Sequence, residues 1–228
     1  MMPLEAVFFD FDGVITDSEI LHFRAFNQAL AEYKIQITKK DYYTDYLGLS
    51  DFDFFKALCT KGLIKLDDEK TTQLLRRKTK IFEKLAKSQG SIIDGIPEFL
   101  TMLRQNNIPM AICSGAILSE IELILEQAQL RSFFEDIVSC EQIARGKPDP
   151  EGFFLALKKL NQKNRDLIHS NQCVVIEDSH WGLEAANAAG MHSIAITNSY
   201  TAEQLAMAEK TVSHLSELNM TDLQKLCK

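Results

Sequence analysis

The feature that most constrains the fold of this 228-residue chain is a series of short apolar runs that alternate with helical patterns. The runs are rich in β-branched and aromatic residues and are bounded by turn or cap residues, which is typical of buried strands. They lie at 5–9, 110–113, 136–139, 173–176 and 193–197. Apolar residues at helical spacing lie between them, at 97–106, 119–130, 151–160 and 182–189. This alternation predicts an α/β fold in which helices cover both faces of a parallel sheet.

One long stretch, at 17–91, interrupts the alternation. It contains no convincing buried strand, and its helical segments are expected at 18–33, 38–46, 51–61 and 67–87. A helical insertion of this kind after the first strand would fold as a small bundle of its own. We therefore predict an α/β catalytic core at 1–16 and 92–228, and a four-helix cap at 17–91. Because the insertion follows the first strand, we expect the cap to act as a lid.

Composition and charge narrow the class of protein. Hydrophobic residues make up 46% and charged residues 25%, as in ordinary globular enzymes. Acidic residues outnumber basic ones by 32 to 25 without a long basic run, which disfavours nucleic acid or membrane as the partner. No membrane span or leader is expected. The five scattered cysteines form no Cys-x-x-Cys pair, so neither a disulfide framework nor a zinc site is predicted. We expect a cytoplasmic protein that is a monomer or weak dimer.

Two aspartates, Asp10 and Asp12, follow the first predicted strand and precede Gly13. Two carboxylates at this spacing suit phosphoryl transfer, since one can attack phosphorus while the other handles the proton of the leaving oxygen. A magnesium ion would hold the phosphate and mask the negative charge that repels an anionic nucleophile. The pattern by itself is equally compatible with a solvated acidic turn.

Polar residues from three other parts of the chain are expected at the same edge of the sheet. Ser114 and Gly115 follow the second predicted strand, Glu177 and Asp178 follow the fourth, and Lys147 precedes a helix. In an open parallel sheet, ligands bind beyond the carboxyl ends of the strands. We therefore expect these side chains to converge with the aspartate pair.

Each of these residue types suits a metal-bound phosphate. The Ser114 hydroxyl and the Gly115 amide can donate to phosphate oxygens, and Lys147 can offset their charge. Asp178 offers the hard oxygen that Mg²⁺ prefers, whereas Glu177 ligates directly, ligates through water or only orients its neighbours. Taken singly, a helix cap, a surface charge or a strand-end cap also explains each residue. The coincidence of all these residues at one edge of the sheet favours a functional site.

These groups resemble, in chain order, the four motifs of the haloacid dehalogenase-like superfamily, and the helical insertion resembles its four-helix cap. The segments at 13–17 and 22–26 are most similar to β-phosphoglucomutase and its sugar-phosphatase relatives. The resemblance implies a Rossmann-like core, an aspartyl phosphate formed on Asp10, and Asp12 as general acid and base. It also implies that Asp10, the backbone carbonyl of Asp12, and Asp178 hold Mg²⁺. A dehalogenase is not expected, because those members lack the second aspartate.

Cap residues bear on the choice between phosphatase and mutase. His22 and Lys78 match the mutase-like pattern, and Ser50 lies in the cap loop that the resemblance assigns to substrate binding. The mutase pattern has an arginine after that serine, where this chain has Asp51. The arginine would grip the far phosphate of a bisphosphorylated sugar, and an aspartate would repel it. Trp181 is bulkier than the small residue usual in its motif, and no role is predicted for it.

The sequence thus predicts a Mg²⁺-dependent phosphatase of small phosphorylated metabolites, with sugar or polyol monophosphates as the expected substrates. A β-phosphoglucomutase-type phosphohexose mutase is the alternative, and product analysis separates the two. A non-catalytic binding protein on the same scaffold is the third possibility. Such a protein is expected to have lost a catalytic residue, and none is lost here.

Overall fold

The computed structural model describes residues 4–47, 49–89 and 92–227. The chain forms two compact units, which are Met1–Asp17 with Ile92–Lys228, here called the core unit, and Ser18–Ser91, here called the cap unit. Among the described residues, no helix combines the length and the apolar character needed to cross a membrane.

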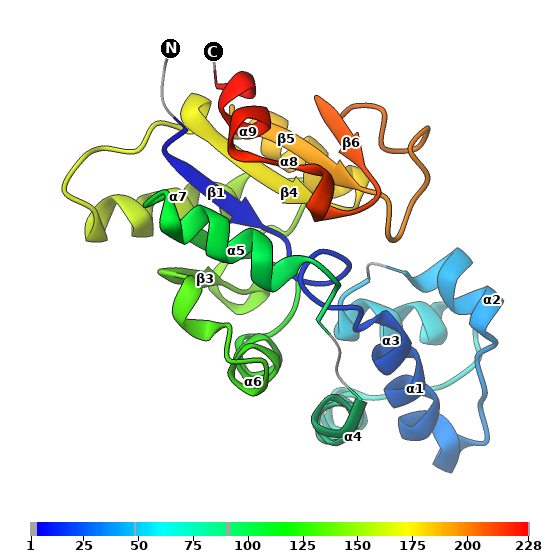
Figure 1. The fold of residues 1–228 in the computed structure, drawn as a ribbon. Coiled ribbons are helices and arrows are strands. Elements are labelled where there is room, and N and C mark those ends of the chain that lie inside the picture. The colour runs from blue at the N-terminus through cyan, green and yellow to red at the C-terminus, as the bar shows by residue number, and fades with distance from the viewer. Residues whose placement is uncertain (1–3, 48, 90–91, 228) are drawn as a thin grey trace. The chain divides into compact units, whose positions relative to one another are not determined.

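The core unit contains a six-stranded sheet in which all paired strands are parallel (Figure 1). The strand order is β3-β2-β1-β4-β5-β6. The strands are β1 (Ala6–Phe9), β2 (Met110–Cys113), β3 (Asp136–Val138), β4 (Cys173–Glu177), β5 (His192–Ile196) and β6 (Lys210–Val212). The predicted parallel α/β sheet is therefore confirmed, with β6 as an additional strand at one edge.

The helices of the core unit cover both faces of the sheet. Successive residues of a strand point to opposite faces, and successive residues of β1 contact different helices. The Phe8 ring contacts Phe153 of α7 edge-on at 6.4 Å, whereas Phe9 contacts Phe99 of α5 at 6.1 Å. The α-helices of this unit are α5 (Ile96–Gln105), α6 (Leu118–Gln127), α7 (Glu151–Lys163), α8 (His180–Ala188) and α9 (Met220–Leu226). Short 3₁₀ turns are η3 (Arg131–Phe133), η4 (Cys140–Gln142), η5 (Ser170–Gln172) and η6 (Leu215–Glu217). All residues of the central strand β1 are consequently buried.

The cap unit is helical throughout its regular structure. Its elements are α1 (Glu19–Leu30), η1 (Ala31–Tyr33), α2 (Lys39–Asp41), η2 (Tyr42–Tyr46), α3 (Asp51–Thr60) and α4 (Asp68–Gln89). The helix expected at 38–46 is a short α2 that continues as the π-helical turn η2. Aromatic residues form the centre of the unit, where the Phe26 and Phe54 rings stack at 3.8 Å. The cap unit therefore has an apolar interior of its own.

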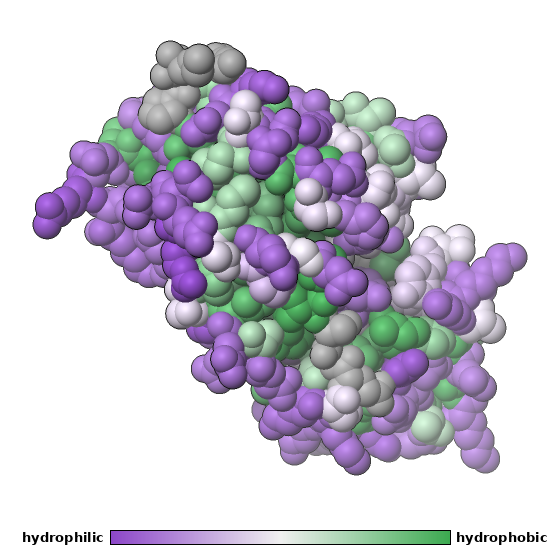
Figure 2. Space-filling model, viewed as in Figure 1, coloured by the Kyte–Doolittle hydropathy of each residue, from purple (hydrophilic) through white to green (hydrophobic). Residues whose placement is uncertain are grey.

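The molecular surface is mixed in character. Hydrophilic residues make up most of the face drawn in Figure 2, with hydrophobic residues between them in places. Apolar side chains instead fill the two interiors. Every residue of β1 and β2 is buried in the core unit, and Phe26 and Phe54 are buried in the cap unit. In the core unit, several of the buried polar residues, among them Asp10, Ser114 and Asp178, follow the carboxyl ends of strands, as described next.

Candidate active site

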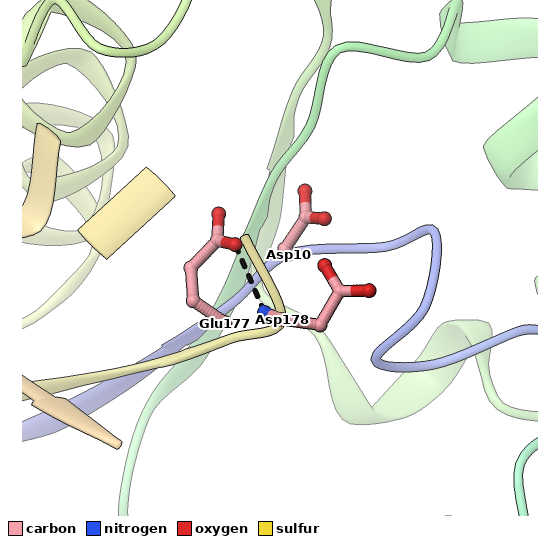
Figure 3. Close-up of side chains that lie close together, drawn as sticks. All are labelled: Asp10, Glu177 and Asp178. Atoms are coloured by element: carbon pink, nitrogen blue, oxygen red, sulfur yellow. Dashed lines mark hydrogen bonds between the residues drawn. The ribbon is translucent and has the colours of Figure 1, made fainter. Parts of the chain in front are cut away.

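Acidic side chains from separate strands meet at the carboxyl edge of the sheet (Figure 3). Asp10 comes directly after β1, Glu177 ends β4, and Asp178 follows it. Strands β1 and β4 are neighbours in the sheet, so their ends lie side by side. One oxygen from each of the three carboxylates lies within 4.8 Å of the others. All three residues are at least nine-tenths buried.

Lys147 joins two of these carboxylates. Its ammonium nitrogen lies 2.7 Å from Asp10 Oδ1 and 2.5 Å from Glu177 Oε1. The loop that carries Lys147 leads into α7, whose Phe153 ring lies 5.5 Å from the ammonium. Since the side chain of Lys147 is only 15% exposed, these contacts hold its charge inside the site.

Both carboxylate oxygens of Glu177 accept hydrogen bonds. Its Oε1 accepts from Lys147, while its Oε2 accepts from the amides of Asp178 and Ser179 and from the Ser179 hydroxyl. A Cβ at Gly182 would lie 1.7 Å from Oε1, so only glycine leaves room for the carboxylate. Both oxygens are engaged, which favours the orienting role among the three that sequence left open.

The excess of negative charge shapes the electrostatics of the site. Burial, and then repulsion from Glu177 and Asp12, raises the pKa of Asp10 to about 7, although Lys147 opposes this shift. Burial and the charges of Glu177 and Asp10 raise the pKa of Asp178 well above its usual range. Attraction to Asp10 and Glu177 outweighs burial and raises the pKa of Lys147. One lysine faces several carboxylates, so this hard-oxygen donor set fits a divalent cation such as Mg²⁺.

The other core residues expected at the site lie at the same edge. Ser114 follows β2, the other neighbour of β1, and is buried, with its hydroxyl oxygen accepting from the amide of Ala116 at 3.0 Å. Gly115 comes next, and a Cβ there would meet nothing within 4 Å. Asp12 is half-buried in the turn that follows Asp10.

The cap residues form a cluster within their own unit. The Lys78 side chain is fully buried, with its nitrogen 2.8 Å from His22 Nδ1 and 2.9 Å from Asp51 Oδ2. Burial, and then the charge of Lys78, lowers the pKa of His22 well below its usual range, so the ring is neutral. Asp51 and Lys78 compensate each other's charge inside the cap unit. The Ser50 oxygen accepts from the Asp53 amide at 3.1 Å and caps α3.

Two residues near the carboxylates were not anticipated. Ser199 donates a hydrogen bond to Asp178, and Asn198 donates one to the backbone carbonyl of Gly13. Both follow β5, so the strand-end rule that located Asp10 and Ser114 also points to them.

Comparison with known proteins agrees with this geometry. The family model for haloacid dehalogenase-like hydrolases matches residues 7–196. The phosphorylated carbohydrates phosphatase of Thermotoga maritima is 30% identical over 192 residues, which cover 84% of each chain. The chloroplastic 5-amino-6-(5-phospho-D-ribitylamino)uracil phosphatase of Arabidopsis thaliana is 34% identical over 160 residues. That match covers 70% of this chain and 41% of the plant protein, so the chain spans less than half of that relative.

The fold comparison extends over nearly the whole chain. The crystal structure of β-phosphoglucomutase from Clostridium difficile matches with a TM-score of 0.84 and 25% identity, covering 98% of this chain and 97% of that one. The β-phosphoglucomutase of Bacillus subtilis is 27% identical over 197 residues, 85% of this chain and 83% of that one. Because the family model spans the chain from β1 to β5, this protein belongs to the haloacid dehalogenase-like hydrolases.

Proposed function

We propose that this protein is a Mg²⁺-dependent phosphatase that hydrolyses small phosphorylated metabolites through an aspartyl phosphate on Asp10. The observation that carries the proposal is the Asp10 carboxylate, held 2.7 Å from Lys147 among buried acidic residues at the end of the central strand. Relatives named as phosphatases of phosphorylated carbohydrates and of a phosphoribitylamino compound support the same reaction class.

The metal site is proposed to consist of Asp10, Asp178 and the backbone carbonyl of Asp12. Bound Mg²⁺ would supply positive charge to the phosphoryl oxygens and lower the repulsion among the carboxylates. Glu177 is proposed to act from outside this set, because both of its oxygens are already occupied by donors. Its function would be to hold Lys147 and the turn that carries Asp178.

The chemistry assigned to the remaining residues follows from their positions. An Asp10 oxygen attacks phosphorus and forms the new P–O bond, while the bond to the alcohol oxygen breaks. Asp12 gives its proton to the departing alkoxide and then takes one from the water that hydrolyses the aspartyl phosphate. Lys147 fixes the other oxygen of Asp10, and the Ser114 hydroxyl and Gly115 amide are proposed to donate to the phosphoryl oxygens.

The cap unit favours a phosphatase of monophosphates over a mutase. A mutase has to retain a second phosphate, for which a free cation is needed. Lys78 is paired with Asp51 at 2.9 Å, so its charge is already compensated inside the cap unit. Roles for His22, Ser50 and Lys78 in binding the substrate stay predictions.

The direct test is a phosphate-release screen over sugar, polyol and carboxylate monophosphates, with Mg²⁺ and with excess EDTA. We expect turnover only with Mg²⁺, and none for Asp10→Asn, because an amide cannot form the acyl phosphate. Full activity in EDTA would overturn the metal-assisted mechanism. Activity of Asp10→Asn within tenfold of wild type would overturn the nucleophile assignment.

A second experiment decides between phosphatase and mutase. The protein is incubated with β-glucose 1-phosphate and a trace of the bisphosphate, and both products are followed. We expect free phosphate. Accumulation of glucose 6-phosphate much faster than free phosphate would replace the phosphatase by the mutase.

A further inference from the structure

The loop Thr197–Tyr200, which follows β5, binds both segments that carry the proposed metal ligands. The Asn198 side-chain nitrogen donates to the backbone carbonyl of Gly13 at 2.7 Å. The Ser199 hydroxyl donates to Asp178 Oδ2. This loop therefore connects the turn after Asp10 with the segment after β4.

The turn after Asp10, the segment after β4 and the loop after β5 pack closely together at Gly13. Its φ of +78° is a left-handed conformation that favours glycine, and a Cβ there would lie 1.8 Å from Asp178 Oδ2 and 3.0 Å from the Ser199 oxygen. The Gly13 backbone, the Asp178 carboxylate and the Ser199 hydroxyl thus form one contact. A shift of the loop after β5 would break its hydrogen bond to the Gly13 carbonyl or to the Asp178 carboxylate.

Aromatic contacts attach the same loop to α8. The Tyr200 ring lies edge-on to His180 at 5.2 Å and to Trp181 at 6.3 Å, and the His180 and Trp181 rings lie 3.9 Å apart. Both residues begin the helix that follows Asp178. Trp181, for which the sequence predicts no role, therefore packs against the loop that holds the Asp178 carboxylate.

The hydrogen bond from Ser199 also determines which Asp178 oxygen is engaged. Oδ2 accepts from Ser199, whereas Oδ1 accepts no hydrogen bond from any residue that the structure describes.

We propose that Asn198 and Ser199 are positioning residues for the divalent cation, acting through the Gly13 turn and the Asp178 carboxylate. This inference rests on the proposed Mg²⁺-dependent function. Outer partners that orient metal ligands typically contribute about 10- to 100-fold to metal affinity. We expect Ser199→Ala to weaken Mg²⁺ binding by that factor, and Asn198→Ala to weaken it in the same direction.

The test measures Mg²⁺ binding by isothermal titration calorimetry without substrate. Ser199→Thr keeps a hydroxyl and should restore affinity to within about threefold of wild type. Ser213→Ala is the matched control. Ser213 follows β6, the strand next to β5, and among the described residues its side chain makes no hydrogen bond to the Gly13 turn or to the segment after β4. In activity assays, the loss in Ser199→Ala should be regained at high Mg²⁺, because every proposed ligand is still present.

The outcomes separate this inference from the proposed function. If wild type binds Mg²⁺ and releases phosphate but Ser199→Ala titrates like wild type, the positioning role is wrong and the phosphatase stands. If wild type binds no Mg²⁺, both are wrong. Melting temperatures in EDTA distinguish a purely structural role: a lower value for Ser199→Ala with unchanged Mg²⁺ affinity would also overturn the inference.

Discussion

Gly182 is the position where one added methyl group should do most damage to the site. In Gly182→Ala the new Cβ would lie 1.7 Å from Glu177 Oε1 and 2.4 Å from Oε2, whereas ordinary contact begins at 3.4 Å. Glu177 is fully buried, so its carboxylate would have to move by more than an ångström and lose its geometry with Lys147 and Ser179.

Gly182→Ala disrupts a buried charged pair but also removes a glycine from a helix, and these two effects on stability oppose each other. Breaking a buried charged pair costs about 3–5 kcal/mol, while alanine in place of glycine within a helix stabilises by about 1 kcal/mol. We therefore expect the free energy of unfolding to fall by roughly 2–4 kcal/mol, or the melting temperature by about 4–16 °C. Turnover should fall about 10- to 100-fold, because Lys147 loses a charged partner.

Urea unfolding followed by Trp181 fluorescence measures the stability of the core unit. Gly146→Ala is the control, since a Cβ there meets nothing within 4 Å, and it should change stability by no more than about 1 kcal/mol. A Gly182→Ala variant with wild-type stability and turnover would refute the close confinement of Glu177.

Three further predictions concern charge and metal. The pKa of Asp10 in the folded protein, about 7, exceeds its ordinary value of 3.8, so in EDTA the free energy of unfolding should fall as pH rises between these values. Urea unfolding at a series of pH values should show a weaker pH dependence for Asp10→Asn. Asp51→Asn removes the negative charge beside buried Lys78 but leaves a polar side chain there, so it should destabilise the cap unit by about 1–3 kcal/mol, measured by circular dichroism. Asp45→Asn, which breaks an exposed pair, should cost less than about 1 kcal/mol, and equal losses would contradict the argument. Finally, Mg²⁺ should alter the fluorescence of Trp181, the single tryptophan, through Tyr200; a response that persists in Asp178→Ala would exclude this route.

Most of the fold could be predicted because its strands are apolar and its helices periodic. The runs around Phe8 and Val175 are buried on both sides, which leaves a continuous apolar signal. Strand β6 was missed because it has three residues at the sheet edge, of which only Val212 is buried. The π-helical turn η2 also carries no signal distinct from an ordinary helix.

The candidate site also has positions that the sequence predicts and contacts that it does not. The strand-end rule accounts for the positions of Asp10, Ser114 and Asp178, and it also points to Ser199, which follows β5. The pairing of Asp51 with Lys78 was not predictable, because these residues lie on different helices and no periodic pattern relates them. Sequence therefore indicates which residues reach an edge, while charge compensation within a buried cluster depends on tertiary packing.

The central position of β1 has a consequence for biosynthesis. Its partner strands begin at Met110 and Cys173, although β1 itself ends at Phe9. At a synthesis rate of about 5–20 residues per second, roughly 10–30 s pass between the synthesis of the fully apolar β1 and the completion of β4. The cap unit is one continuous segment and has its residues together well before then. The nascent chain thus exposes for longest a strand that is completely buried in the finished protein, and we expect chaperones to bind there.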